Sequence, residues 1–241
     1  MRFAPILLLA AVLAVAGCAD LRAIDESRDD RRDFGDPGAR LVIDNDGGEL
    51  RLVAADGATV VVERSLTGKA TLDGNASWTM AGDTLRLAVT CSGFVPDCGG
   101  RHVVRVPAGV AVEMTSDAPV RAAGLDAAFS ATVRDSWLRV ENPAGRLRLE
   151  ADLAVQVSGA RSADVAARSI ERGVDLGFAG PPTRVLARAA GSVAVTLPAG
   201  PQTYRVTAAP GRPALRSDPA STRTVAATAG RGHTASVRKA G

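Results

Sequence analysis

The sequence predicts an all-β protein, a single-domain β-solenoid built as a right-handed β-helix-like stack of short strands, with a β-sandwich as the alternative. From residue 39 onward, apolar and polar residues alternate over short stretches that Gly, Pro, Asn or Asp interrupt, which is the pattern of many short strands. These stretches recur about every 8 to 12 residues, a spacing that suits both architectures. Aromatic residues make up 3% of the chain, so the core must consist of Ala, Val and Leu, and such small inward residues favour the solenoid.

The first 17 residues have the features of a removable export signal. Arg2 precedes an apolar run from about Ala4 to Ala16 that ends in small residues. This run is shorter than the roughly 20 apolar residues that a membrane-spanning helix needs. We therefore expect residues 1–17 to be removed from the mature protein.

A cysteine follows this signal directly. Val15, Ala16, Gly17 and Cys18 resemble the lipobox of bacterial lipoprotein precursors. The resemblance implies that Cys18 carries the lipid, palmitate included, and becomes the first residue of the mature chain. Two acyl chains are sufficient for stable anchoring to a membrane. The alternative is an ordinary secretory signal that contains a cysteine and is cut near Gly17 or Ala19.

Residues 18–38 are predicted to be the lipidated Cys and a disordered charged tether. The stretch from Ala19 to Gly38 has no apolar periodicity and ends in Gly-Asp-Pro-Gly, so it cannot bury enough surface to fold by itself. A charge-driven helix is the alternative. The β-strand-repeat domain is then expected to span residues 39–241.

Cys91 and Cys98 remain as a pair in an exported chain, and we expect them to form a disulfide. Closing so short a loop stabilises a fold by about 2.5 kcal/mol. Because residues 84–89 and 102–106 both alternate, the bond is expected to pin the end of a hairpin between them.

The clearest strand candidates elsewhere share the same alternation, and they are residues 40–43, 49–53, 59–63, 138–141, 146–150 and 192–197. The segment Val103 to Gly109 recurs as Val193 to Gly200, in each case a strand stopped by Pro and turned by Gly. The Ala-rich segment 151–172 has a composition that a helix also tolerates, but we assign it to strands.

The sequence contains no recognisable catalytic or metal site, and we predict no enzymatic activity and no cofactor. His102 and His233 are expected to be exposed at strand ends, and with only these two histidines the cysteine pair makes a poor zinc site. No Gly-x-Ser-x-Gly or His-Glu-x-x-His motif occurs. Five aspartates could supply paired carboxylates for polysaccharide cleavage only if two of them met, and the turn residues near them favour backbone capping instead; they are Asp126, Asp135, Asp152, Asp164 and Asp175.

Residues 44–49, Asp-Asn-Asp-Gly-Gly-Glu, faintly resemble the beginning of a calcium-binding loop. The remainder of such a loop is missing. A type I′ hairpin turn between residues 41–43 and 50–52 accounts for the same residues better.

The charge of the chain is nearly balanced. Its formal net charge of +3 is not that of a nucleic-acid-binding protein. The last segment, 205–241, is locally basic and could lie on anionic lipid headgroups or cell-wall polymers, although charges so widely spread favour a solvated face. Its charged residues are Arg205, Arg212, Arg216, Asp218, Arg223, Arg231, Arg238 and Lys239.

Several segments together resemble a known family. The chain is similar to a bacterial family of β-strand-repeat lipoproteins of unknown function, which is related to the putative auto-transporter adhesin head domains. The resemblance implies a β-strand-repeat fold and a displayed, adhesin-like protein, and it specifies no chemistry. It rests on Trp78, residues 83–87, the Cys91 to Cys98 loop, and residues 104–112, 173–178, 191–198 and 204–206.

The leading functional hypothesis is a cell-envelope lipoprotein, anchored to the outer face of the cytoplasmic membrane or to the outer membrane. Its role would be that of a non-catalytic, adhesin-like binding or scaffold module. An envelope carbohydrate-active enzyme is one alternative, and a partner or sensor of an envelope-stress system is another. The expected partners are the membrane, through the lipid anchor, and an envelope protein or polymer; neither nucleic acid nor a small-molecule substrate is expected.

Overall fold

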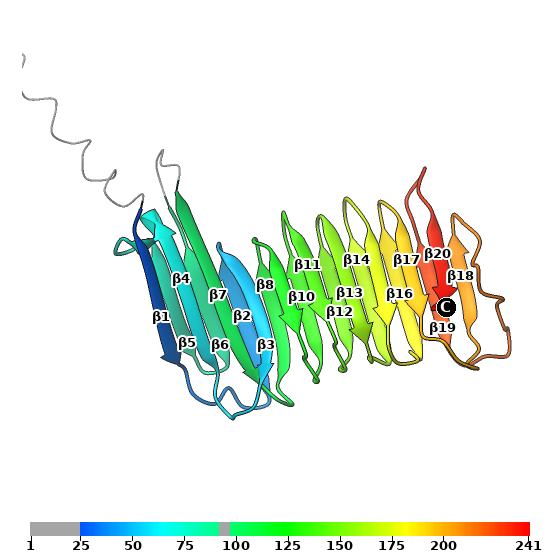
Figure 1. Ribbon diagram of the computed structural model, residues 1–241, viewed down its shortest axis with the longest axis horizontal. Coiled ribbons are helices and arrows are strands. Elements are labelled where there is room, and N and C mark those ends of the chain that lie inside the picture. Colours follow the sequence, from blue (N-terminus) through cyan, green and yellow to red (C-terminus); the bar gives the residue numbers. More distant parts are fainter. Residues whose placement is uncertain (1–24, 92–96) are drawn as a thin grey trace, which may run out of the picture.

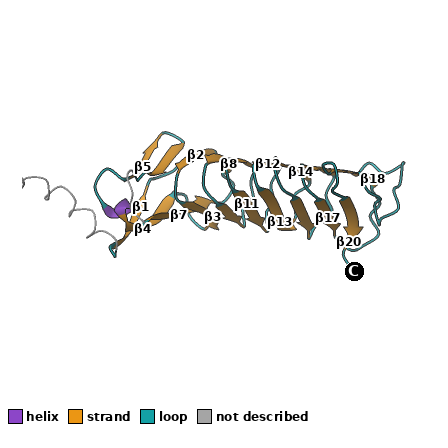
Figure 2. Ribbon diagram, turned by 90° about the horizontal axis from the view of Figure 1, so that it is seen from above, coloured by secondary structure: helices purple, strands orange, loops and turns teal. Residues whose placement is uncertain are grey.

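The computed structural model of the chain describes residues 25–91 and 97–241 (Figure 1). Cys18 and the signal segment 1–17 lie outside the described residues, so lipidation and cleavage stay predictions. Within the described part, the strands form two sheets of ten strands each, and one short 3-10 helix, η2 (Lys69–Thr71), interrupts them. Figure 2 shows the sheets as two facing layers. The prediction of an all-β protein is confirmed.

In each sheet the strands follow one another along the long axis of the molecule, and each strand runs across that axis (Figure 1). Sheet A contains, in spatial order, β1 (Ser27–Asp33), β4 (Val61–Gly68), β7 (Cys98–Pro107), β3 (Glu49–Ala55), β9 (Val120–Ala123), β11 (Trp137–Glu141), β13 (Ala154–Ala160), β15 (Val174–Phe178), β17 (Val193–Leu197) and β20 (Ala235–Lys239). Sheet B contains β18 (Arg205–Ala209), β19 (Thr224–Thr228), β16 (Arg184–Ala189), β14 (Asp164–Ser169), β12 (Leu147–Ala151), β10 (Phe129–Val133), β8 (Ala111–Ser116), β2 (Arg40–Asp46), β6 (Thr84–Val89) and β5 (Ala76–Ala81).

From β8 to β17 the chain winds as a solenoid, since successive strands alternate between sheet B and sheet A. Neighbouring strands of one sheet are parallel, and each pairs with the strand one winding further on. Phe129 pairs with Leu147, and Leu147 pairs with Val165, so one winding takes about 18 residues. The predicted solenoid is confirmed, in a form whose two facing sheets also resemble a sandwich.

Alternation along each strand decides which side chains fill the space between the sheets. In β10, Phe129, Ala131 and Val133 are buried, while the residues between them face solvent or lie at intermediate depth. The same two-residue period continues through the Ala-rich segment 151–172, which forms β13 and β14 and buries Val157 and Val165. Because most inward residues are aliphatic and many are as small as alanine, the core is a narrow continuous stripe.

The N-terminal end of the stack differs from the middle, and it corrects the predicted domain boundary. Residues 27–33 belong to the segment predicted as a disordered tether, yet they form strand β1, which pairs antiparallel with β4. The charged side chains find cross-strand partners: Asp30 pairs with Arg64 at 2.9 Å and Arg31 with Glu63 at 3.6 Å. Backbone pairing together with these ion pairs orders a segment that has no apolar pattern, so the folded domain begins before residue 39.

Two predicted hairpins are wrong in the same way. Residues 84–89 form β6 in sheet B, whereas residues 102–106 belong to β7 in sheet A. Residues 41–43 and 50–52 likewise fall on β2 in sheet B and β3 in sheet A. For the second pair, the turn residues 44–49 were located correctly, but this turn carries the chain from β2 in sheet B to β3 in sheet A. At Gly47 (φ 83°) a Cβ would lie 2.4 Å from the carbonyl oxygen of Val89, so the corner requires glycine.

The C-terminal end is closed by the segment 210–222. Pro210 accepts a hydrogen bond from the backbone of Ala235 at 2.8 Å, and Ala214 donates one to Val237 at 3.0 Å along the outer edge of β20. Asp218 donates its backbone N–H to Tyr204, and the hydroxyl of Ser217 accepts the N–H of Val206 at 2.9 Å beside β18. Strand edges that would otherwise be open are therefore partly paired with the chain's own backbone.

Candidate functional site

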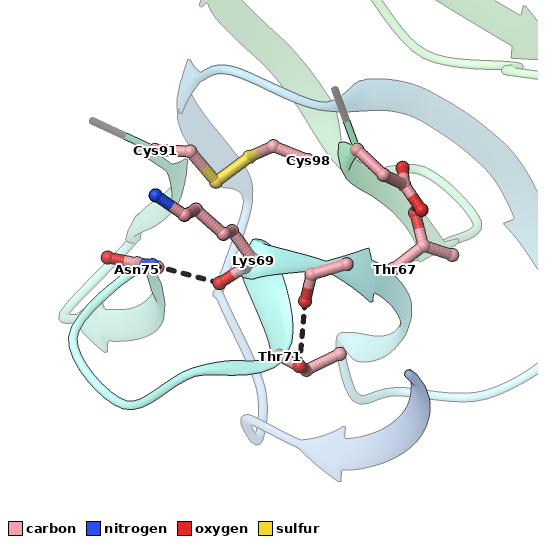
Figure 3. The surroundings of a disulfide bond; sticks show 8 residues. Thr67, Lys69, Thr71, Asn75, Cys91 and Cys98 are labelled. Atoms are coloured by element: carbon pink, nitrogen blue, oxygen red, sulfur yellow. Dashed lines mark hydrogen bonds between the residues drawn. A yellow bond between two sulfur atoms is a disulfide. The ribbon is translucent and has the colours of Figure 1, made fainter. Parts of the chain in front are cut away.

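The predicted disulfide is present: Cys91 and Cys98 are bonded, with their Cα atoms 6.3 Å apart (Figure 3). The bond joins Cys91, two residues after β6 of sheet B, to Cys98, the first residue of β7 in sheet A. Lys69 extends toward it, and the Lys69 carbonyl accepts a hydrogen bond from Asn75 at 2.8 Å. The bond thus ties the two sheets together near the η2 turn, at a place where they are joined by no hairpin.

The five aspartates weighed as a carboxylate ladder do not gather. Asp126 accepts the N–H of Gly109 at 3.0 Å, and Asp152 accepts the N–H of Asp135 at 2.8 Å. Asp175 is exposed on sheet A, while Asp164 forms an ion pair on sheet B. Three of them, Asp126, Asp152 and Asp164, therefore bind backbone N–H groups or arginine side chains.

The segment 44–49 forms the corner between β2 and β3 rather than a cation site. Asp117 accepts the N–H of Gly47 at 2.7 Å. A hydrogen bond with Asp117, and repulsion from it, raise the pKa of Asp46 above its ordinary value. Within the described residues, no group of three or more His, Cys, Asp or Glu side chains could hold a metal ion.

The two histidines differ in their surroundings. His233 is exposed, as predicted. His102 is fully buried, which contradicts the prediction. It lies on an inward position of β7, opposite Arg64 of β4. Burial first, and the charge of Arg64 second, lower the pKa of His102 to about 4, so this histidine is neutral at physiological pH.

The feature that the sequence did not reveal is a hollow on the outer face of sheet B. Four outward positions on β10, β12, β14 and β16 pair in one row, in the order Ser130, Arg148, Ala166 and Leu186. The small Ala166 stands between the longer Arg148 and Leu186, and a hollow of about 310 Å³ opens above it.

The neighbouring row of outward positions contributes more charge. Glu150, Arg168 and Arg188 pair in register on β12, β14 and β16, and all three line the hollow. Arg168 lies 3.6 Å from Glu150. Arg188 has no carboxylate partner in the described part of the chain.

Asp164 anchors the arginines at the other side of the hollow. Its carboxylate lies 2.8 Å from Arg148 and 3.7 Å from Arg146. The hydrogen bond from Arg148 is the main reason that the pKa of Asp164 is lowered, and the charges of Arg184 and Arg146 add to it. We call this group the arginine hollow; its charged residues are Arg146, Arg148, Glu150, Asp164, Arg168, Arg184 and Arg188.

The arginine hollow is flanked by smaller hollows on both sides. One of about 170 Å³ shares Arg148 and extends to β8, and another of about 240 Å³ shares Arg168 and Arg188 and extends to Thr228 of β19. The result is an elongated cationic trough across the strands of sheet B.

The basic C-terminal segment 205–241 does not form one patch. Arg205 and Arg223 lie at the sheet B side, where they donate to the carbonyls of Pro219 and Pro182 at 2.9 Å. Arg238 belongs to β20 of sheet A. The segment is thus divided between the two sheets, and the main concentration of arginines lies before it in the sequence.

No known family model and no curated protein matches the chain. Solved structures to which it is similar include a putative cell adhesion protein from Clostridium sporogenes, at 9% identity and a TM-score of 0.37, over 89% of this chain and 100% of that one. A putative adhesin from Bacteroides fragilis is 11% identical, with a TM-score of 0.38, over 88% and 97% of the two chains. A putative adhesin from Parabacteroides merdae is 10% identical, with a TM-score of 0.34, over 90% and 97%.

In residues 25–91 and 97–241, no helix has the length and apolar character to span a bilayer.

Proposed function

We propose that this chain is a non-enzymatic binding module of the bacterial cell envelope, and that its arginine hollow binds a linear anionic polymer. The observation that supports this is the charge of the hollow, where five arginines surround two carboxylates. Guanidinium groups present planar, fixed donors that match the oxygens of phosphates and carboxylates. A solvent-exposed excess of such groups attracts polyanions.

The shape of the trough favours a polymer over a compact ligand. The hollows follow one another across the strands from β8 to β19, and parallel strands are about 4.8 Å apart. Arg168 and Arg188 occupy the same register position on adjacent strands. A chain with repeated anionic groups can therefore contact several arginines in succession.

The position of the trough favours a ligand other than the anchoring membrane. The export signal and the lipobox-like sequence support attachment through Cys18, and a disulfide is typical of proteins outside the cytoplasm. Strand β1 starts nine residues after Cys18. It stands at one end of the stack, whereas β16 and β19 stand near the other end (Figure 1). A polymer that lies away from the anchor can reach these strands.

The binding test uses fluorescently labelled polyphosphate and polyglutamate, which present the two candidate anions without sugar rings. We expect the double substitution Arg168→Gln and Arg188→Gln to weaken binding roughly 30-fold, since each arginine contributes about 1 kcal/mol. The matched control, Arg31→Gln with Arg86→Gln, removes the same charge outside the hollow and should bind like the unmodified protein. The tighter of the two polymers identifies the anion.

The proposal is wrong if the double variant and the control bind equally well. It also fails if affinity does not fall between about 50 and 300 mM salt, because exposed charges are screened over that range. The anchor is tested separately by mass spectrometry of the mature protein, in which Cys18 should be N-terminal and acylated.

A further inference from the structure

The outer face of sheet A carries a row of arginines that the preceding proposal does not use. Arg51, Arg121 and Arg139 lie at the same register position on β3, β9 and β11, and all three are exposed. Like charges directly opposite one another on adjacent strands destabilise a sheet. A fold selected for stability alone has no reason to keep this row.

A tryptophan stands beside the row. The guanidinium of Arg121 lies 4.8 Å from the ring centre of Trp137, and its Nε lies 3.2 Å from a carboxylate oxygen of Glu49. Arg121 is therefore held in place by an ion pair and by stacking against the indole. On the other side of the tryptophan, the paired position on β13 holds only Ala154.

The small Ala154 leaves space next to the indole. A hollow of about 250 Å³ is lined by Trp137, Arg139, Ala154 and Gln156, together with Arg121. Arg139 donates its Nε to the side-chain oxygen of Gln156 at 2.9 Å. This hydrogen bond fixes the guanidinium and leaves the amide nitrogen of Gln156 as a donor.

A second hollow adjoins the first. It has a volume of about 440 Å³, and its lining includes Glu49, Arg51, Arg101 and Glu141 as well as Arg121. Arg121 lines both hollows, and we call the two adjoining hollows together the groove of sheet A. Sheet A is the opposite layer from sheet B, which carries the arginine hollow (Figure 2).

We propose that this groove binds an acidic oligosaccharide, with one uronic acid ring in the hollow beside Trp137. The apolar face of the sugar ring packs on the indole, the carboxylate binds the fixed guanidinium of Arg139 in a bidentate manner, and Gln156 donates to a hydroxyl. The next residues of the oligosaccharide extend over Arg121 toward Arg51. An anionic polymer without sugar rings would use the arginines but not the tryptophan.

The test uses trigalacturonate and its methyl ester, in which each carboxylate is replaced by a neutral ester while the sugar rings stay the same. The chain contains two tryptophans, so Trp78→Phe leaves Trp137 as the only indole, and trigalacturonate should change its fluorescence in a saturable manner. In calorimetry, Trp137→Ala should weaken binding of both trisaccharides at least tenfold. Arg139→Gln should weaken binding of trigalacturonate about tenfold and leave binding of the methyl ester unchanged.

A stability measurement separates binding from damage to the fold. Arg139→Gln removes one of three like charges, so the unliganded variant should unfold at the same urea concentration as the unmodified protein or a higher one. Arg188→Gln, which alters only the arginine hollow, should bind trigalacturonate normally, so this site and the polymer site can fail independently. The proposal is overturned if the unmodified protein does not bind trigalacturonate, or if Trp137→Ala binds it as tightly.

Discussion

The buried His102 makes the stability of this fold depend on pH in a way that can be worked out from its surroundings. The side chain is fully buried, and neither ring nitrogen has a hydrogen-bond partner in the described part of the chain. Its paired residue on β4, Arg64, faces the same interior and is itself bonded to Asp30 at 2.9 Å. Protonating His102 would place a second cation next to Arg64 and add an N–H donor for which the described part of the interior provides no acceptor.

The direction in which stability changes with pH follows from the pKa values of His102 in the unfolded and folded states. The pKa of His102 falls from 6.5 to about 4 on folding, so between these values the unfolded chain binds more protons than the folded one. Stability is therefore fully present above pH 6.5 and is lost as the pH falls toward 4. At 1.36 kcal/mol for each pKa unit, the loss amounts to about 3 kcal/mol.

The measurement is urea unfolding of the unmodified protein and of His102→Leu at several pH values from 7 to 4. Carboxylates titrate in both proteins, so the difference between the two free energies of unfolding isolates the histidine. We expect His102→Leu to gain about 3 kcal/mol relative to the unmodified protein over this range. His233→Leu, which changes an exposed histidine, serves as the control. Parallel pH profiles for the unmodified protein and His102→Leu would refute the reasoning.

Two further predictions concern the corners of the solenoid. Gly145→Ala should lower the free energy of unfolding by about 1–3 kcal/mol, because the new Cβ would lie 1.7 Å from the carbonyl oxygen of Ala127. In the control, Gly177→Ala, the nearest atom would be 3.5 Å from the new Cβ. Equal melting temperatures of the two variants would contradict this prediction. Asp46→Asn should raise the melting temperature at pH 7 by about 1–2 °C. Asp117 raises the pKa of Asp46 in the folded protein, so the stability that comes from protonated Asp46 is lost as the pH rises through this pKa. The gain should vanish in acid, where both carboxyl groups are protonated, and a gain independent of pH would exclude this cause.

The local pattern predicted the strands well because a buried strand needs only alternation. Leu147 and Leu149, for example, are inward on β12 just as their spacing indicates. The pattern could not tell where a turn leads. A Gly-rich corner such as that at Gly47 looks the same whether the chain returns in the same sheet or crosses to the other, and the choice depends on parallel pairing with residues many positions away.

The missed strand and the missed site have a common cause. The order of β1 comes from partners on β4, such as Glu63 for Arg31, and no property of residues 27–33 alone reveals them. Likewise, Arg168 and Arg188 stand side by side only because β14 and β16 pair in register. The position of a charged residue in a fold depends mainly on its partners, which a single sequence does not identify. Sequence analysis therefore assigns such residues to the solvent-exposed surface.

Three of the four edge strands of the stack are protected. The segment 210–222 occupies the outer edges of β18 and β20, and β1 presents charged side chains at the other end of sheet A, so growth by strand addition is disfavoured at these three edges. The two faces then offer different chemistry. Sheet B presents excess positive charge around a small residue, whereas sheet A combines its arginines with Trp137. Because salt screens charge but not stacking on an indole, polymer binding on sheet B should weaken with salt far more steeply than binding of a neutral sugar ester on sheet A, and equal salt dependence on the two faces would mean that they recognise charge alone.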